Sequence, residues 1–265
     1  MIRRIWALFR KELRSLFATP IAYLVLTASV SVTAVLFFDH LVRFNRLLFV
    51  FHSEGIGAGG FDTGTTPRQL NLLEEVFIPL SQDVSLMLLL VVPLITMRVF
   101  AEEKSQGTDE LLLTTPLRSW EISAAKFLTA WIFIALLLAV SALYPAVAIQ
   151  QAHLGLPHLL ALYVGQLGFG IAVASIGLAC SALSRSQIVA AVVAYAFSFI
   201  VYDFHWLETL VSQPFAHVLQ EVALQSHLQN FARGLVEFRH WVYFLSIGVL
   251  GFSISVASIE LGRAR

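Results

Sequence analysis

Six apolar runs, each with at most one charged residue, take up much of this 265-residue chain and limit what it can fold into. A helix that crosses the hydrocarbon core of a bilayer needs about 20 mainly apolar residues. The second and fifth runs are short, but flanking residues 78–81 and 204–207 can extend them. The pattern therefore predicts six transmembrane segments, at residues 21–38, 84–99, 127–149, 159–183, 188–202 and 241–259.

The composition indicates the same class of protein. Hydrophobic residues make up 58% of the chain and charged residues 13%, whereas a soluble domain has about half and about a quarter. Backbone groups in hydrocarbon must be hydrogen-bonded internally, so a span is a helix or a strand of a closed barrel. The alternating pattern of a barrel is absent. We therefore expect an all-α integral membrane protein that forms a single transmembrane domain over residues 1–265.

Lysine and arginine are distributed unevenly along the chain. If the N-terminus lies in the cytoplasm, 12 of the 17 basic residues fall on the cytoplasmic side, as expected for loops that remain inside. This topology places both termini in the cytoplasm and the segments 39–81 and 203–240 outside the membrane. The net charge is zero, and no basic domain with stacking aromatics predicts binding to nucleic acid.

Residues 1–20 precede the first span. Their apolar residues recur at helical spacing on one face, with arginine and lysine on the opposite face. This pattern predicts an amphipathic helix lying in the membrane interface before the chain turns at Pro20. The alternative is a basic anchor for the first span. A secretory signal is excluded because the run at 21–38 is too long for a signal core and no small-residue cleavage site closes it.

The two outer segments contain short apolar stretches. Residues 41–51 and 70–77 flank a glycine-rich centre and are apolar enough to lie along the membrane surface. Under the predicted topology all histidines lie on the outer side or its interface, which suggests a metal site or a pH sensor. No histidine pair has i, i+4 spacing and no acid is an evident ligand, so we expect no metal site. We interpret His217 and His227 as isolated residues of an amphipathic surface.

The chain lacks the motifs of an enzyme or of a self-powered carrier. There is no Walker phosphate loop, no HExxH and no GxSxG. Under the predicted spans no charged residue lies near the middle of a helix, whereas proton-coupled carriers depend on such groups. We expect no catalytic residue, cofactor or metal in this chain, and an energy source in another subunit.

Residues 98–126 carry most of the charge between two spans and read RVFAEEKSQGTDELLLTTPLRSWEISAAK. Two adjacent acids, Glu102 and Glu103, follow the point where the chain leaves the membrane, and Gly107 allows a sharp turn after them. Thr108 is placed to cap a short helix that has acids in its first turn. The apolar residues 111–113 follow, and Pro116 ends the helix. The stretch predicts a cytoplasmic loop that docks on another protein, and the alternative is a solvated loop.

This stretch resembles the hallmark segment of the ABC-2 type permeases. The likeness is to the branch that includes the gliding-motility-type permeases and the nitrous-oxide-reductase accessory permeases. The sequence RKELRSLFATPIAYLVL resembles the amphipathic elbow of that family, and SRSQ its short hairpin between spans four and five. HLQNFARGLVEFRHWVYFLS resembles the segment that leads into its last span. The insert at 39–81 is longer than the family pattern.

The resemblance implies a six-helix permease in a bacterial inner membrane. Such a subunit pairs with a second permease, as a homodimer or with a paralogue, and docks two cytoplasmic ATPase subunits that bind ATP and Mg. A coupling helix after the second span contacts the ATPase. The matching residues here are Glu102, Glu103, Gly107, Thr108, Glu110, Leu111 and Pro116.

The implied activity is export, or mechanical work on an extracytoplasmic partner protein. The sequence leaves two alternatives open. One is an ATP-independent channel or carrier, and the other is a membrane anchor that transmits force without moving a substrate.

Overall fold

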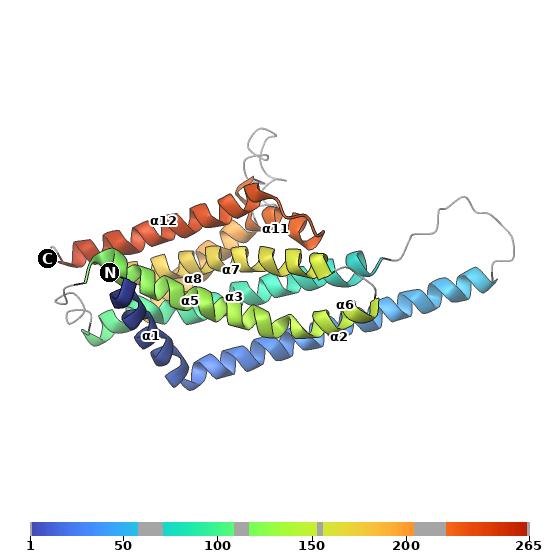
Figure 1. Cartoon of the computed structure of the whole chain (residues 1–265), viewed down its shortest axis with the longest axis horizontal. Helices are drawn as coiled ribbons and strands as arrows, with labels where there is room; N and C mark the ends of the chain where they lie inside the picture. The colour runs from blue at the N-terminus through green and yellow to red at the C-terminus, as the bar shows by residue number, and fades with distance from the viewer. Residues whose placement is uncertain (1, 58–70, 109–116, 153–155, 204–220, 264–265) are drawn as a thin grey trace.

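The computed structural model is an elongated helical bundle with both chain termini at one end (Figure 1). It describes residues 2–57, 71–108, 117–152, 156–203 and 221–263. All regular structure in these ranges is helical, as the sequence predicts. The helices are α1 (Ile2–Ala18), α2 (Pro20–Gly57), α3 (Ile78–Gln106), α5 (Ser119–Ser141), α6 (Leu143–Ala152), α7 (Leu156–Leu183), α8 (Gln187–Tyr202), α11 (Leu224–Ala232) and α12 (Phe238–Arg263), with one π-helical turn, η1 (Leu73–Phe77), before α3.

Five stretches of helix are long and apolar enough to cross a membrane. They are Pro20–Val50, Leu73–Gln106, Ser119–Ile149, Pro157–Leu183 and Phe238–Arg263. The predicted span at 188–202 forms α8, which has 16 residues and packs against α3 and α7. Residues 204–207, which were expected to extend it, lie outside the described residues. A sixth span therefore stays a prediction.

Several helices run past the boundaries that the sequence suggested. Residues 41–51 do not form a separate surface segment, because α2 continues through them to Gly57. The first glycine or proline after Pro20 is Gly55, so no residue interrupts the hydrogen-bond ladder. An i, i+4 ion pair of 3.6 Å between Arg43 and Asp39 lies on this continuation. The predicted surface stretch at 70–77 is likewise replaced from residue 73 onward by η1, which leads directly into α3.

The core of the bundle is built around α7, the most buried of the five long apolar stretches. Its glycines allow other helices to come close, as small residues do in membrane bundles. A Cβ at Gly165 would overlap the ring of Phe231, and one at Gly177 would overlap the side chain of Thr96. The small-residue face therefore packs within the chain, against α3, α11 and α12.

Helix α1 is the expected amphipathic N-terminal helix, and it crosses the other helices at a steep angle (Figure 1). It packs mainly on α5. Leu8 and Phe9 are buried in a cluster with Phe100, Ile122 and Phe127, whereas Trp6 is 59% exposed. The apolar face of α1 is thus shared between the protein core and the surroundings. Thr19 separates it from α2.

Candidate functional site

The predicted coupling residues are divided between the end of α3 and the segment after it. Glu102 and Glu103 lie in the last turn of α3, and Gly107 and Thr108 follow directly. The other predicted residues, Glu110, Leu111 and Pro116, lie outside the described residues. The described site is therefore the base of the loop.

Gly107 ends α3 in the left-handed conformation, with φ of 68°. Its N–H donates to the carbonyl oxygen of Lys104 at 3.4 Å, and the N–H of Thr108 donates to that of Glu103 at 3.0 Å. This pair of bonds is the Schellman arrangement, which favours glycine because a Cβ is strained at positive φ. A Cβ here would meet no atom within 4 Å, so backbone conformation alone requires glycine.

Thr108 also uses its side chain at the end of α3. Its Oγ1 donates to the carbonyl oxygen of Glu103 at 3.3 Å. The sequence predicted that Thr108 caps the beginning of the next helix, whose residues lie outside the described ranges. That role stays a prediction, and within the described residues the hydroxyl closes the end of α3.

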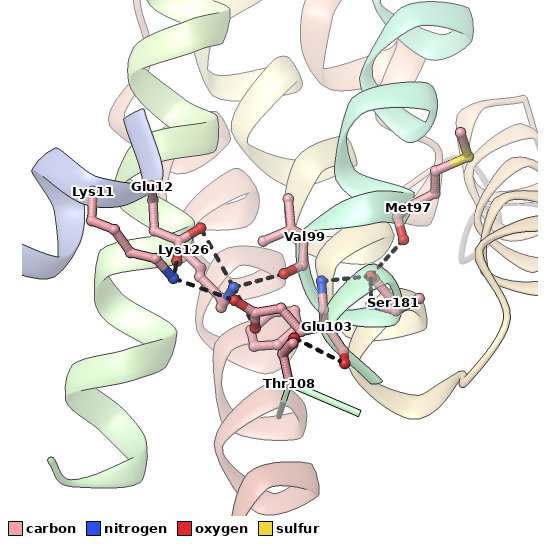
Figure 2. A network of polar contacts seen from close by, with 10 residues as sticks. Lys11, Glu12, Met97, Val99, Glu103, Thr108, Lys126 and Ser181 are labelled. Carbon is pink, nitrogen blue, oxygen red and sulfur yellow. Dashed lines mark hydrogen bonds and ion pairs between the residues drawn. The ribbon is translucent and has the colours of Figure 1, made fainter. Parts of the chain in front are cut away.

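A buried lysine from α5 holds the base of this loop (Figure 2). The side chain of Lys126 is 1% exposed, and its Nζ lies 2.9 Å from Glu103 Oε2 and 3.5 Å from Glu12 Oε2. The same Nζ donates to the carbonyl oxygen of Val99 at 2.7 Å. It also lies 5.1 Å from the ring centre of Phe100. A buried ammonium group is tolerated when it is paired and hydrogen-bonded in this way.

A second lysine completes the network from the more exposed side. Lys11 Nζ lies 3.4 Å from Glu12 Oε1 and 3.7 Å from Glu103 Oε1. Two lysines and two glutamates thus alternate and connect α1, α3 and α5. The Lys11 side chain is 58% exposed, so its pairs are worth about 0–1 kcal/mol. The pairs of Lys126 hold the network together.

Helix α7 fixes the same turn of α3 from the other side. Ser181 Oγ accepts from the N–H groups of Phe100 and Ala101, both at 3.1 Å, and donates to the carbonyl oxygen of Met97 at 2.8 Å (Figure 2). Lys104 Nζ donates to the carbonyl oxygen of Ala182 and lies 3.3 Å from Ser258 Oγ of α12. The last turns of α3 are therefore held by α5, α7 and α12.

The far end of the loop is also anchored. At the start of α5, the N–H of Arg118 donates to Glu121 Oε2 at 2.9 Å, and Glu121 is buried. Arg263 of α12 donates to the carbonyl oxygen of Leu117 and lies 3.4 Å from Ser119 Oγ. Both chain segments that enter the loop are thus attached to the bundle.

Sequence reasoning missed Glu12 and the burial of Lys126. A signal for both was present. Glu12 stands on the apolar face of α1, between Phe9 and Leu16 at helical spacing. Lys126 lies between Ile122 and Ala130, which are buried on the core face of α5. Charges of opposite sign on the core faces of two neighbouring helices indicate a buried ion pair.

The opposite end of the bundle contains a pair of buried histidines. His227 of α11 and His240 of α12 are 4% and 8% exposed, and their Nδ1 atoms are 2.7 Å apart. The His227 ring is stacked on Tyr243, with ring centres 3.9 Å apart. The interpretation of His227 as an isolated surface residue is therefore wrong, because α11 packs on α7 and its His227 side chain lies against His240 and Tyr243 of α12. His217 lies outside the described residues.

The partners of the two rings define their neutral tautomers. His227 Nε2 lies 2.8 Å from the carbonyl oxygen of Glu221, so this nitrogen carries a proton. Its Nδ1 then accepts from His240 Nδ1–H, and His240 Nε2 accepts from Asn230 Nδ2 at 2.8 Å. Burial lowers the pKa of His227, with a smaller contribution from His240 in the same direction. In the described part of the chain no three His, Cys, Asp or Glu side chains form a metal-binding group.

Comparison with known proteins agrees with this architecture. The family model described as ABC-2 family transporter protein matches residues 65–214, more than half of the chain. The match includes the loop after α3 and both Glu103 and Lys126. No curated protein matches the chain. The chain belongs to the ABC-2 family of transporter proteins.

Proposed function

We propose that the segment between α3 and α5 docks a cytoplasmic ATPase subunit, and that the Lys126 network transmits movement of this segment to the bundle. Membership of the family makes the chain the membrane-spanning permease subunit of an ABC transporter, a transmembrane component that is not itself the ATPase. The docking surface and its mechanical link to the helices are the proposed parts.

The observation that carries the proposal is the position of the Lys126 ammonium group between Glu103 of α3 and Glu12 of α1. A docked loop moves helices only if its ends are attached to them rigidly. The Schellman turn at Gly107 and the contacts of Ser181 stiffen the first end. The contacts of Arg118 and Arg263 hold the second. Movement of the loop is thereby passed to several helices together.

The predicted site residues take different parts in this proposal. Glu103 belongs to the transmitting network, and Gly107 and Thr108 shape the end of α3. Glu110 and Leu111 supply charged and apolar contacts to the ATPase, and Pro116 ends the docking helix. Glu102 lies outside the Lys126 network and contributes least to the coupling.

The finer assignments rest on the sequence resemblance and on the distribution of basic residues. We place the chain in the branch of the gliding-motility-type and nitrous-oxide-reductase accessory permeases, in a bacterial inner membrane with both termini in the cytoplasm. It pairs with a second permease, a copy or a paralogue. ATP and Mg bind the partner ATPase, and turnover drives export or mechanical work on an outer protein. Reporter fusions at Gly107 and Arg185 should report a cytoplasmic location, and an external signal at Gly107 would overturn the topology.

The test separates docking from transmission. Leu111→Asp should abolish co-purification of the ATPase subunit, because it puts a charge into an apolar contact. Lys126→Met combined with Glu103→Gln should keep co-purification but reduce stimulated ATP turnover, since it removes the charged link while keeping the volume. Arg185→Gln, an exposed change away from the loop, is the control. Full stimulation in the Lys126→Met/Glu103→Gln variant would remove the network from the coupling path.

Export and force transmission can be distinguished by what ATP turnover moves. Reconstitution of the permease with its ATPase in vesicles should show ATP-dependent movement of a substrate if the function is export. ATP turnover without flux, together with movement of an outer partner in a pulling assay, would favour mechanical work.

A further inference from the structure

A cavity of about 390 Å³ lies beside the ion-pair network, between α1 and the beginning of α2 on one side and α3 on the other. Part of α5 lines it as well. One end is polar and includes Arg98 and Glu102. The other end is apolar and includes Ala22, Leu94 and Phe133. Its volume falls in the range of small-molecule sites, about 300–1,000 Å³.

The charges around the cavity fall into two groups. Lys11, Glu12, Glu103 and Lys126 satisfy one another in the network. Arg98 and Glu102 remain, one turn apart on α3. Within the described ranges neither takes part in an ion pair, and Arg98 Nε is buried without a hydrogen-bond partner. The cavity therefore offers one cation and one anion to a ligand.

The polarity changes along α3 in a fixed direction. Glu102 lies in the last turn, Arg98 one turn further into the span, and Leu94 a further turn in. A ligand that matches this order has a cationic tip, then an anionic group, then a hydrocarbon chain. A phospholipid with an ethanolamine headgroup has these groups in this order, and it stands in a bilayer with its chains toward the membrane centre.

We propose that this cavity binds an ethanolamine phospholipid of the adjacent leaflet. The phosphate accepts hydrogen bonds from the Arg98 guanidinium, which matches phosphate geometry well. The ammonium group donates to the Glu102 carboxylate. The upper part of one acyl chain lies against Leu94, Ala22 and Phe133, and the rest of the lipid stays in the bilayer. Choline has no N–H to donate, and a glycerol headgroup has no cation for Glu102.

The test uses the purified full chain without an ATPase, so its result is independent of the proposed coupling. The protein is placed in phosphatidylcholine nanodiscs that contain either phosphatidylethanolamine or phosphatidylglycerol as the minor lipid. Lipid retained after delipidation is then quantified by native mass spectrometry. We expect about tenfold enrichment of the ethanolamine lipid over both others, equivalent to about 1.4 kcal/mol.

Single substitutions test which residue binds the phosphate and which binds the ammonium group of the lipid. Arg98→Gln should lower retention of all phospholipids about tenfold, whereas Glu102→Gln should abolish only the preference for ethanolamine. Ala22→Phe should fill the apolar end and lower retention. Arg185→Gln and Ala196→Leu, both exposed and away from the cavity, are the matched controls.

Three results would overturn the proposal. They are equal retention of the three lipids by the unmodified chain, unchanged retention in folded Arg98→Gln, and displacement of the lipid by soluble glycerophosphoethanolamine or inorganic phosphate. The last result would identify a site for a free phosphate compound, because a membrane lipid held partly by its chain is not displaced by its headgroup alone. The native helical circular dichroism of each variant verifies that it is folded.

Discussion

The two ends of the bundle bury polar side chains in different ways. Near the chain termini, Lys126 is buried as a charge and is balanced by Glu103 and Glu12. At the other end, His227 and His240 are buried as rings that hydrogen-bond to each other and to Glu221 and Asn230. The first arrangement depends on opposite charges, and the second depends on the rings being neutral. The two ends should therefore respond differently to mutation and to pH.

The largest expected effect comes from removing the central charge of the ionic end. Lys126→Ala leaves two acids beside a space that the ammonium group occupied, and breaking a buried pair in this way costs about 3–5 kcal/mol. Denaturant unfolding in detergent micelles measures the loss. The combined Lys126→Met, Glu12→Gln and Glu103→Gln variant removes the three charges at the buried centre of the network. It leaves only Lys11, which is exposed, and should recover most of the stability. A loss below about 1 kcal/mol for Lys126→Ala would show that the pair behaves like an exposed one.

A backbone change at the same end should have the next largest effect. Gly107→Pro requires a negative φ where the structure has 68° and removes the N–H that donates to Lys104. We expect about 3 kcal/mol or more of local destabilisation, seen as faster hydrogen exchange in residues 103–106. Gly107→Ala should cost about 1–2 kcal/mol. Equal exchange in all three proteins would show that the turn does not stabilise α3.

The histidine end should lose stability in acid. Burial lowers the pKa of His227 in the folded chain, so below about pH 6.5 the unfolded chain takes up a proton that the folded chain does not. Stability is complete above this pH and falls as the pH drops, by up to about 1.4 kcal/mol per pH unit for one group. His227→Gln should flatten the pH profile just below about pH 6.5, the unfolded-state pKa of histidine. If stability falls with pH as steeply in this variant as in the unmodified chain, groups other than His227 cause the loss of stability in acid.

The groups around the histidines set the limits of this effect. Glu237 Oε2 lies 3.3 Å from His240 Nε2, so its negative charge faces the histidine pair. Two charges would place two N–H groups face to face at Nδ1. Arg239, paired with Glu221, adds a smaller effect that lowers the pKa of His227.

The smallest effect should come from an acid outside the ionic network. Glu102→Gln removes a charge that forms no ion pair within the described residues and accepts only a long hydrogen bond of 3.5 Å from Gln106. The free energy of unfolding should therefore change by about 0–1 kcal/mol and stimulated ATP turnover by less than twofold. The double change Glu102→Lys/Glu103→Lys differs, because a lysine at 103 lies beside Lys126 and Lys11. The buried network predicts lower stability as well as lost coupling.

Sequence reasoning was most reliable where the physics is local. The class of protein follows from the apolar runs, because helices satisfy the backbone hydrogen bonds of such runs in hydrocarbon. The turn at Gly107 follows from a residue that alone tolerates positive φ at low cost. The continuation of α2 was also available, since residues 21–54 contain no glycine or proline. The sequence interpretation treated a change of polarity after residue 38 as the start of a separate segment at 41–51, whereas the helix continues through these residues.

What the sequence by itself determined is therefore the helical membrane class, most of the helices and the turn at the end of α3. The tertiary structure decided which polar side chains meet. Lys126 and Glu12 are 114 positions apart and pair only because α1 folds back onto α5. His227 meets His240 only because α11 packs on α7 beside the start of α12. Helical periodicity shows which face of its own helix a residue occupies, but the partner on the neighbouring helix depends on how the two helices cross.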